Sequence, residues 1–307
     1  MQVDDQFSFA LLEILSCQPS KLLIEKNLRE SSLKGNSTAS LILGRLYESG
    51  QYINKIDHGL SKEFYTKASE QGNSYGYFRL GLMYKNDSVK GEGQETVSFF
   101  KKSAEMGNTD ALVELAYLYF EGKYLEKNEQ KAIELIEKAA DAGNSTATYA
   151  LASFYSSGRA VEKDGQKALE LYQKAAELGE ANAFFSIGFL YYSGDCVKQD
   201  YQKALEWFNK GVEIDDPDSS YMIGRLYEDG KGVEQDIQKS IQIYQSLVSS
   251  DKAILRLGYL YEKGKGVEQN YQKAIEYYQK AAELKNTHAL LSLGKLYQDG
   301  NGFEQNI

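Results

Sequence analysis

The chain has 307 residues, and its 35 Lys or Arg against 44 Asp or Glu give a formal net charge of −9. Binding to nucleic acid depends on cationic side chains at phosphates, so this acidic balance argues against a nucleic-acid partner. The two cysteines, Cys17 and Cys196, form no CxxC motif and no paired spacing. They predict reduced thiols in a cytosolic protein rather than a disulfide scaffold.

The N-terminus does not have the pattern of a signal peptide. Asp4 and Asp5 stand where positive charge is expected, and Glu13 interrupts the apolar stretch. No window of the sequence approaches 18 uninterrupted apolar residues, so we expect no insertion into a membrane. The sequence therefore favours a cytoplasmic protein, with a secreted effector as the open alternative.

Residues 1–35 are predicted to form an N-terminal helical cap. Lys21 to Leu33, followed by Gly35-Asn36, has the pattern of a helix with its terminator, and Phe7 to Ser16 is the expected partner helix. Such a cap would cover the first unit of the repeat that follows.

From residue 36 onward the sequence repeats itself. A small residue, which we call the anchor, is followed two and three positions later by an apolar residue and a Tyr, at intervals of 34 to 37 residues. Positions are counted from this anchor below, and eight of the 24 Tyr residues occupy position +3. The anchors are Gly44, Gly81, Ala116, Ala152, Gly188, Gly224, Gly258 and Gly294.

Each repeat predicts a hairpin of two helices. Small or apolar residues at −5, −1, +2 and +3 form one stripe of the first helix, so the Tyr at +3 should pack between helices. A Gly-rich loop follows, and then the second helix opens with Lys-Ala and ends with Lys-Ala-Ala and Gly. Its Ala residues allow close approach of the two helices. The expected N-caps are Asp164, Asp200, Asp236 and Asn270, and the expected terminators are Gly72, Gly107, Gly143 and Gly179.

The pattern A-x-x-x-x-G-x-L-Y-x-x-G-x-G-V, then D-x-x-K-A, then K-A-A-E-x-G resembles the Sel-1-like repeat, a relative of the tetratricopeptide repeat. The resemblance implies an all-α fold: a right-handed superhelical α/α solenoid of about eight hairpins over residues 36–307, which ends mid-repeat. It also implies that the first helices line the concave side, and that the protein is an adaptor or scaffold rather than an enzyme.

Two segments depart from the pattern. Around 211–252 an acidic turn replaces the terminating Gly and the unit is two residues short, which predicts a local change of pitch or, alternatively, neutral drift. At the other departure, Gly300 to Ile307 aligns with Gly230 to Ile237, where a second helix should begin. We therefore expect that the natural chain continues or that another chain covers this end, with end-to-end self-association as one form.

The motifs of common catalytic and metal sites, such as HExxH, GxSxG and the Walker A loop, do not occur. The two histidines, His58 and His288, are six repeats apart. The regular cysteine pairs of the β-lactam-binding branch of the family are also missing. We therefore expect no catalytic residues, no cofactor and no metal.

A partner-binding surface is predicted at first-helix positions −3, +1 and +4, which face the concave side in tetratricopeptide-like frames. Aromatic residues concentrate there in the middle of the chain, with charged residues toward both ends, as in a contact surface with a polar rim. The alternative is that these aromatics pack against the adjacent repeat. The predicted residues are Phe78, Tyr117, Phe120, Tyr149, Phe185, Phe189, Tyr192, Tyr221, Arg225 and Tyr259.

The expected function is a non-enzymatic scaffold that binds a protein or peptide in this groove. The acidic total charge favours a locally basic partner. Because bacterial members of the resembled family include immunity or inhibitor proteins and host-directed effectors, the alternative is a protein that blocks one specific enzyme or host factor.

Overall fold

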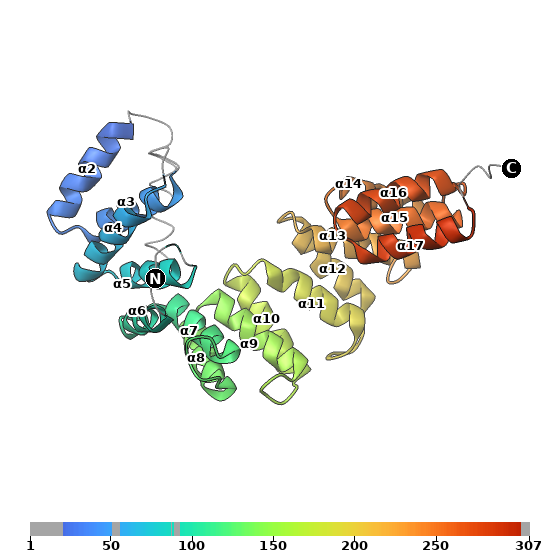
Figure 1. Cartoon of the computed structure of the whole chain (residues 1–307). Coiled ribbons are helices and arrows are strands. Elements are labelled where there is room, and N and C mark those ends of the chain that lie inside the picture. The colour runs from blue at the N-terminus through green and yellow to red at the C-terminus, as the bar shows by residue number, and fades with distance from the viewer. Residues whose placement is uncertain (1–20, 51–55, 87, 89–92, 302–307) are drawn as a thin grey trace. The chain divides into compact units, whose positions relative to one another are not determined.

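A computed structural model describes residues 21–50, 56–86, 88 and 93–301. This part of the chain is built of 16 α-helices and has no strand. It divides into two compact units, Met1–Leu151 (unit 1) and Ala152–Ile307 (unit 2), which are described separately. In each unit, successive helices pair as antiparallel hairpins (Figure 1). The predicted all-α hairpin repeat is therefore confirmed.

Unit 1 begins, in its described part, with α2, which packs against α3. The bounds of α2 are Lys21–Leu33, the same as predicted from the sequence. The predicted partner helix Phe7–Ser16 and Cys17 lie outside the described residues. The helices of this unit are α2 (Lys21–Leu33), α3 (Ser37–Ser49), α4 (His58–Glu70), α5 (Ser74–Lys85), α6 (Gly93–Glu105), α7 (Thr109–Glu121), α8 (Glu129–Asp141) and the first half of α9 (Ser145–Ser157).

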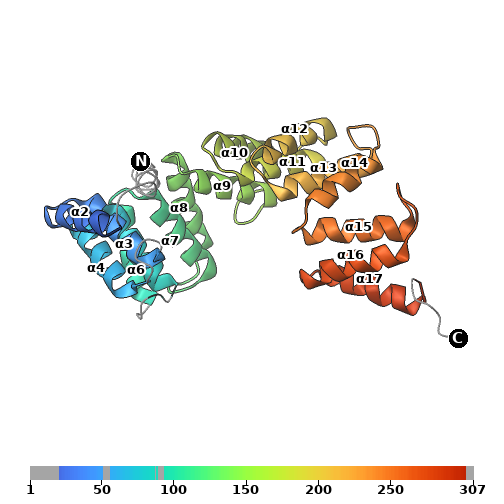
Figure 2. The same cartoon turned by 90° about the horizontal axis from the view of Figure 1, so that it is seen from above.

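Unit 2 takes up the chain within α9. Its last three helices lie side by side in both views, and α16 contacts both α15 and α17 (Figures 1 and 2). The helices that follow α9 are α10 (Gly165–Glu177), α11 (Asn182–Ser193), α12 (Tyr201–Val212), α13 (Pro217–Asp229), α14 (Ile237–Ser246), α15 (Asp251–Lys263), α16 (Tyr271–Glu283) and α17 (Thr287–Gln298).

The helix ends follow the predicted signals. The Asp164 carboxylate accepts a hydrogen bond of 2.9 Å from the backbone N–H of Lys167, three residues into the helix. Asp200, Asp236 and Asn270 cap their helices in the same way. The four predicted terminating glycines have φ between 83° and 89°, the left-handed conformation that ends a helix. The N-cap and terminator predictions are confirmed.

At five of the eight anchors, all of them Gly, the second helix of the same hairpin places a ring where a Cβ would lie. A Cβ added to Gly44 would collide with the Tyr65 ring, and one added to Gly258 would collide with Tyr278. The same holds for Gly81 under Phe100, Gly188 under Phe208 and Gly224 under Tyr244. These rings lie in the hydrophobic core, where packing leaves little room for an added methyl group.

The Tyr at +3 is part of a second recurring contact. The Lys167 ammonium lies 4.1 Å from the centre of the Tyr155 ring and donates a hydrogen bond of 2.7 Å to its hydroxyl. The D-x-x-K motif therefore does two things: Asp caps the helix, and Lys covers the Tyr of the preceding helix. The other such pairs are Lys131–Tyr119, Lys203–Tyr191, Lys239–Tyr227 and Lys273–Tyr261.

Burial of the +3 Tyr decreases along the chain. Tyr47, Tyr84 and Tyr119 in unit 1 are at most 9% exposed, as the prediction of packing between helices requires. The next four, in unit 2, are half-buried, and Tyr297 is 53% exposed. The prediction is therefore confirmed for unit 1, whereas Tyr297 lies on the last first helix, for which the sequence predicts an uncovered apolar face.

Candidate partner-binding face

The residues at −3, +1 and +4 of each first helix are called the first-helix face below. Of the four aromatic rings predicted there in unit 1, one is buried, two are half-buried and one is exposed. Phe78 packs on the core ring of Phe100, 5.9 Å away, and Phe120 is 7% exposed. Tyr149 is half-buried, and Tyr117 is 38% exposed. Among these four, only Tyr117 offers a large exposed ring, so unit 1 has no continuous aromatic surface at these positions.

In unit 2 the aromatic residues form a continuous row along α11, called the α11 ladder: Phe185, Phe189 and Tyr192. The rings of Phe185 and Phe189 stack at 6.0 Å, and those of Phe189 and Tyr192 at 6.2 Å. Their spacing of four and three residues places them on one face of the helix. Phe185 packs against the buried ring of Phe208, while Phe189 is 45% exposed. Phe185 is thus fixed against the core, whereas Phe189 presents an exposed apolar ring.

The ladder leads to a group of charged and phenolic side chains contributed by α13 and the loop after it. The Asp229 carboxylate lies 3.5 Å from the Arg225 guanidinium and 3.4 Å from the Lys231 ammonium. Lys231 in turn lies 5.4 Å from the centre of the Tyr192 ring. Tyr221, also predicted from the sequence, packs against Tyr244 with ring centres 5.7 Å apart. We call Tyr192, Tyr221, Arg225, Asp229 and Lys231 the Arg225 cluster.

The environment keeps Arg225 charged. Burial by itself lowers the pKa of Arg225, but the hydrogen bond with Tyr221 and the charge of Asp229 outweigh it and raise that pKa. The Nε atom of Arg225 is nevertheless buried without a hydrogen-bond partner in the described part of the chain. A buried donor in this state carries an unrecovered desolvation cost.

Tyr259, the last predicted residue, lies on α15 between two cations. The guanidinium of Arg256 is 4.5 Å from the centre of its ring, and the ammonium of Lys265 is 5.3 Å away. These contacts place it in a polar, cation-covered part of the face. The structure therefore joins Phe185, Phe189 and Tyr192 in one aromatic row and places Arg225 beside its end.

Charged residues at +4, which the sequence predicts to form a polar rim, tie neighbouring hairpins together in the structure. Position +4 of one first helix meets position −2 of the next. Glu228 accepts hydrogen bonds of 2.8 and 2.5 Å from Arg256 and one of 3.1 Å from the Tyr244 hydroxyl. The same positions pair Glu48 with Arg79 and, with the charges exchanged, Lys85 with Glu114 at 2.6 Å.

These ties were missed although the sequence holds a signal for them. The residue types at +4 and at the next −2 are complementary in three of the steps: Glu with Arg, Lys with Glu, and Glu with Arg. The Glu228 side chain is only 3% exposed. Burial of the Tyr244 hydroxyl and the negative charge of Glu228 raise the pKa of Tyr244, so its hydroxyl stays protonated and donates to Glu228. These groups hold the face together and are engaged before any partner arrives.

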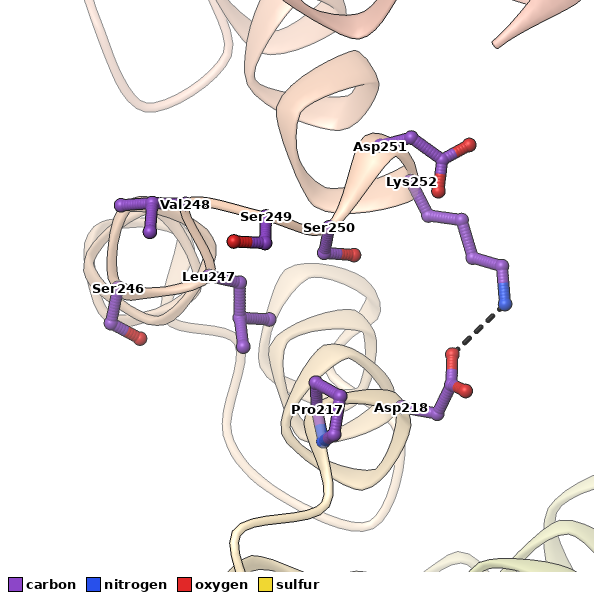
Figure 3. A pocket seen from close by; sticks show the side chains of 9 residues that line it. All are labelled: Pro217, Asp218, Ser246, Leu247, Val248, Ser249, Ser250, Asp251 and Lys252. Carbon is purple, nitrogen blue, oxygen red and sulfur yellow. Dashed lines mark hydrogen bonds and ion pairs between the residues drawn. The ribbon is translucent and has the colours of Figure 1, made fainter. Parts of the chain in front are cut away.

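A cavity of about 410 Å³ marks the segment in which the repeat is two residues short. It is lined by the start of α13, the end of α14 and the start of α15 (Figure 3). The helix α14 has 10 residues, and an ion pair of 2.9 Å between Lys252 and Asp218 crosses one side. Val248 is 77% exposed on the loop. The predicted change of pitch stays a prediction.

The described residues contain no group of three or more His, Cys, Asp or Glu that could hold a metal ion. His58 begins α4 in unit 1, and His288 lies in α17 in unit 2. Cys196 is half-buried in the loop after α11 and donates to the backbone carbonyl of Ser156. Within the part of the chain that the structure describes, no helix is both long and apolar enough to cross a lipid bilayer.

Stacked hairpins with a regular anchor, each burying its apolar face against its neighbours, define a helical-repeat protein. The family model of the Sel1 repeat matches eight consecutive segments: residues 37–73, 74–108, 109–144, 145–180, 183–216, 217–249, 251–286 and 287–307. The chain therefore belongs to the Sel1 repeat family. Proteins of this family are generally scaffolds for protein interactions and are typically non-catalytic.

Solved structures agree with this assignment. The chain is similar to a protective antigen with an SLR fold from uropathogenic Escherichia coli, with 27% identity over 92% of this chain and a TM-score of 0.76. It spans 62% of the length of that antigen. It is also similar to a Sel1 repeat protein from Oxalobacter formigenes, with 27% identity over 95% of this chain and 84% of that one, and a TM-score of 0.64. Among curated proteins, none matches the sequence.

Proposed function

We propose that the protein is a non-catalytic interaction scaffold and that it binds a protein or peptide on the first-helix face of unit 2. The observation that carries this proposal is the α11 ladder, whose middle ring, Phe189, is 45% exposed. Aromatic residues and Arg contribute a disproportionate share of binding free energy in protein interfaces. Here they occur together on one face.

The ladder suits binding because its rings are already ordered. Phe185 rests on Phe208, and the edge of the Tyr192 ring meets Tyr201 with ring centres 5.6 Å apart. A partner that covers these rings therefore immobilises few side chains, which lowers the entropic cost of association. The opposing interpretation, that the ladder only packs against the neighbouring hairpin, applies to Phe185 more than to Phe189.

The proposal is tested by removing the exposed half of the ladder. The unaltered full chain is immobilised and used to capture partners from a lysate of the cell that naturally makes the protein. We expect the double variant Phe189→Ala/Tyr192→Ala to lose these partners. Its melting temperature should change by only a few degrees, because neither side chain is fully buried. Captured proteins are compared by mass spectrometry.

The matched control is Val248→Ala, which removes exposed apolar surface from unit 2 at a site off the first-helix face. It should retain every partner of the unaltered chain. A partner that binds the double variant as tightly as the unaltered chain would refute this face as the binding surface. A large drop in melting temperature would instead show that the ladder is core.

A second surface favours self-association of the chain through α17. Leu290, Leu291 and Tyr297 are 58%, 72% and 53% exposed, so they form an apolar face on one helix. A twofold contact between two copies would cover the same patch on both. Light scattering after size exclusion should show a concentration-dependent dimer that Leu291→Lys abolishes, and a monomer at all concentrations would refute this.

The finer alternative, a dedicated inhibitor of one enzyme or host factor, stays a prediction from the family resemblance. The capture experiment separates it from a general scaffold. One partner retained at high affinity favours the inhibitor, whereas several partners that share the ladder favour the scaffold.

A further inference from the structure

We infer that the first-helix face of unit 2 recognises a peptide segment that carries a carboxylate next to an aromatic or aliphatic side chain. The carboxylate would pair with Arg225 and Lys231, and the apolar side chain would pack on Phe189 and Tyr192. This inference rests on the proposed function and specifies the chemistry of its partner. It reverses the expectation of a basic partner that the total charge suggests.

The local charge differs in sign from that of the whole chain. The Arg225 cluster holds two cations, Arg225 and Lys231, against the single carboxylate of Asp229. The neighbouring pair of Arg256 and Glu228 adds no net charge. A ligand at the ladder therefore meets a net positive charge although the chain as a whole carries −9. Salt largely screens charges that lie more than about 10 Å from the ligand, so the charges of the cluster act on it more strongly than the rest of the chain does.

The two arginines of this face show which cation is still available. Arg256 donates two hydrogen bonds of 2.8 and 2.5 Å to Glu228, so its charge is paired at close range. Arg225 meets Asp229 only at 3.5 Å, beyond the 2.7–2.9 Å that charge-assisted hydrogen bonds adopt. The Arg225 side chain is 29% exposed, so a ligand can reach part of it from solvent. An incoming carboxylate would supply the acceptor that Asp229 provides incompletely.

Aromatic rings lie on one side of the Lys231 ammonium, whose side chain is 38% exposed. The Lys231 ammonium lies 5.4 Å from the centre of the Tyr192 ring and 5.6 Å from that of Tyr201. Interactions between charges strengthen where water is partly excluded. The ladder continues from Tyr192 to Phe189, with ring centres 6.2 Å apart. A carboxylate at the cluster and an apolar side chain one to a few residues away can therefore be bound together.

The probe is a random dodecapeptide library displayed on phage and selected on the immobilised full chain. The selected peptides should contain Asp or Glu near an aromatic or aliphatic residue. The best peptide is then synthesised together with its Glu→Gln or Asp→Asn version, and both affinities are measured by calorimetry. Because hydrogen bonds to a charged group are strong, we expect the neutral version to bind about ten- to a hundredfold more weakly.

Two variants of the chain give opposite results if the inference is right. Lys231→Met should weaken binding of the acidic peptide about tenfold, while the matched control Lys198→Met, in the preceding loop, leaves it unchanged. Asp229→Asn should strengthen binding severalfold, because it removes the carboxylate that competes for Arg225 and Lys231. A gain in affinity cannot result from misfolding, which makes this variant the more telling one.

Selected peptides that are basic, or a loss of affinity in Asp229→Asn, would overturn the inference. Peptides that need Phe189 and Tyr192 but ignore Lys231 and Asp229 would overturn it and leave the proposed function intact. If the peptides bind the Phe189→Ala/Tyr192→Ala variant with unchanged affinity, or if the selection yields no peptide, both the inference and the proposed function are refuted.

Discussion

Successive first helices of unit 2 can be compared at two places, α13 with α15 and α15 with α17. The two places differ in the pair between +4 and the next −2 and in the ring that covers the anchor. Glu228 of α13 is held by Arg256 of α15, and the anchor of α15, Gly258, lies under the Tyr278 ring of α16. At the next step Glu262 occupies the place of Glu228, but Ser292 stands where Arg256 would. Among the described residues, no atom of another element lies within 4 Å of a Cβ placed on the anchor Gly294.

The difference separates what a single helix requires from what its neighbours require. Nothing in an isolated first helix needs a glycine at the anchor, because Gly lowers helix stability by about 1 kcal/mol relative to Ala. At Gly44, Gly81, Gly188, Gly224 and Gly258 a ring of the second helix occupies the space of a Cβ, although the repeat with Tyr172 at the ring position has Ala152 as its anchor. Arg at −2 is needed only where the preceding helix presents a buried acid.

The largest effect on stability should come from Arg256→Ser, which places at −2 of α15 the residue that Ser292 provides at −2 of α17. The variant leaves the Glu228 carboxylate, 3% exposed, with the Tyr244 hydroxyl and without a cation. Removing one partner of a buried pair is costly, so we expect the free energy of unfolding of unit 2 to fall by about 3 kcal/mol. Urea unfolding followed by the fluorescence of Trp207, the sole tryptophan, measures it.

The double variant Glu228→Gln/Arg256→Ser serves as the control for this prediction. It removes the buried charge together with its partner, so it should be more stable than Arg256→Ser alone. If Arg256→Ser costs less than about 0.5 kcal/mol, Glu228 is reached by water and the tie does not stabilise the face.

A smaller effect is expected from Gly258→Ala. The added methyl group collides with the Tyr278 ring, which is 1% exposed and donates to Glu262 at 2.6 Å. Overpacking costs about 1–3 kcal/mol, and the better helix propensity of Ala offsets up to about 1 kcal/mol of it. We expect a net loss of about 1–2 kcal/mol in the same urea experiment.

The chain itself suggests the control for Gly258→Ala. Its repeats carry Ala116 as an anchor where the second helix has Ile136 in place of a ring. Gly258→Ala should therefore cost less in a Tyr278→Ile background than in the unaltered chain. Equal costs in the two backgrounds would contradict the ring-against-anchor explanation.

The sequence predicts the hairpins well because their signals are local. Asp164 caps a helix through a residue three positions away, and Gly179 ends the same helix through its own φ. The α2 helix was likewise predicted with its observed bounds from Lys21 to Leu33. Each of these features depends on a few neighbouring residues, so the pattern alone determines them.

The candidate site was only partly predictable because exposure depends on the contact between hairpins. Phe120 and Tyr192 both occupy +4, yet Phe120 is buried and Tyr192 ends an open ladder. The pairing of Glu228 with Arg256 joins residues 28 positions apart, and it is visible in the sequence only if +4 is compared with the next −2. Lys231 lies at +7, outside the positions −3, +1 and +4 from which the site was predicted.

Gly294→Ala is the smallest expected effect and the sharpest test of the comparison. Because no atom of the residues that the structure describes occupies the space of the new Cβ, only helix propensity should act, and α17 should become more stable by up to about 1 kcal/mol. Hydrogen exchange of the α17 amides, measured by mass spectrometry at a concentration at which the chain is monomeric, should slow by up to about fivefold. The same substitution at Gly258 should accelerate exchange in α15 and α16. Faster exchange in α17 would mean that a ring already covers Gly294 in solution, and the two steps would then be alike.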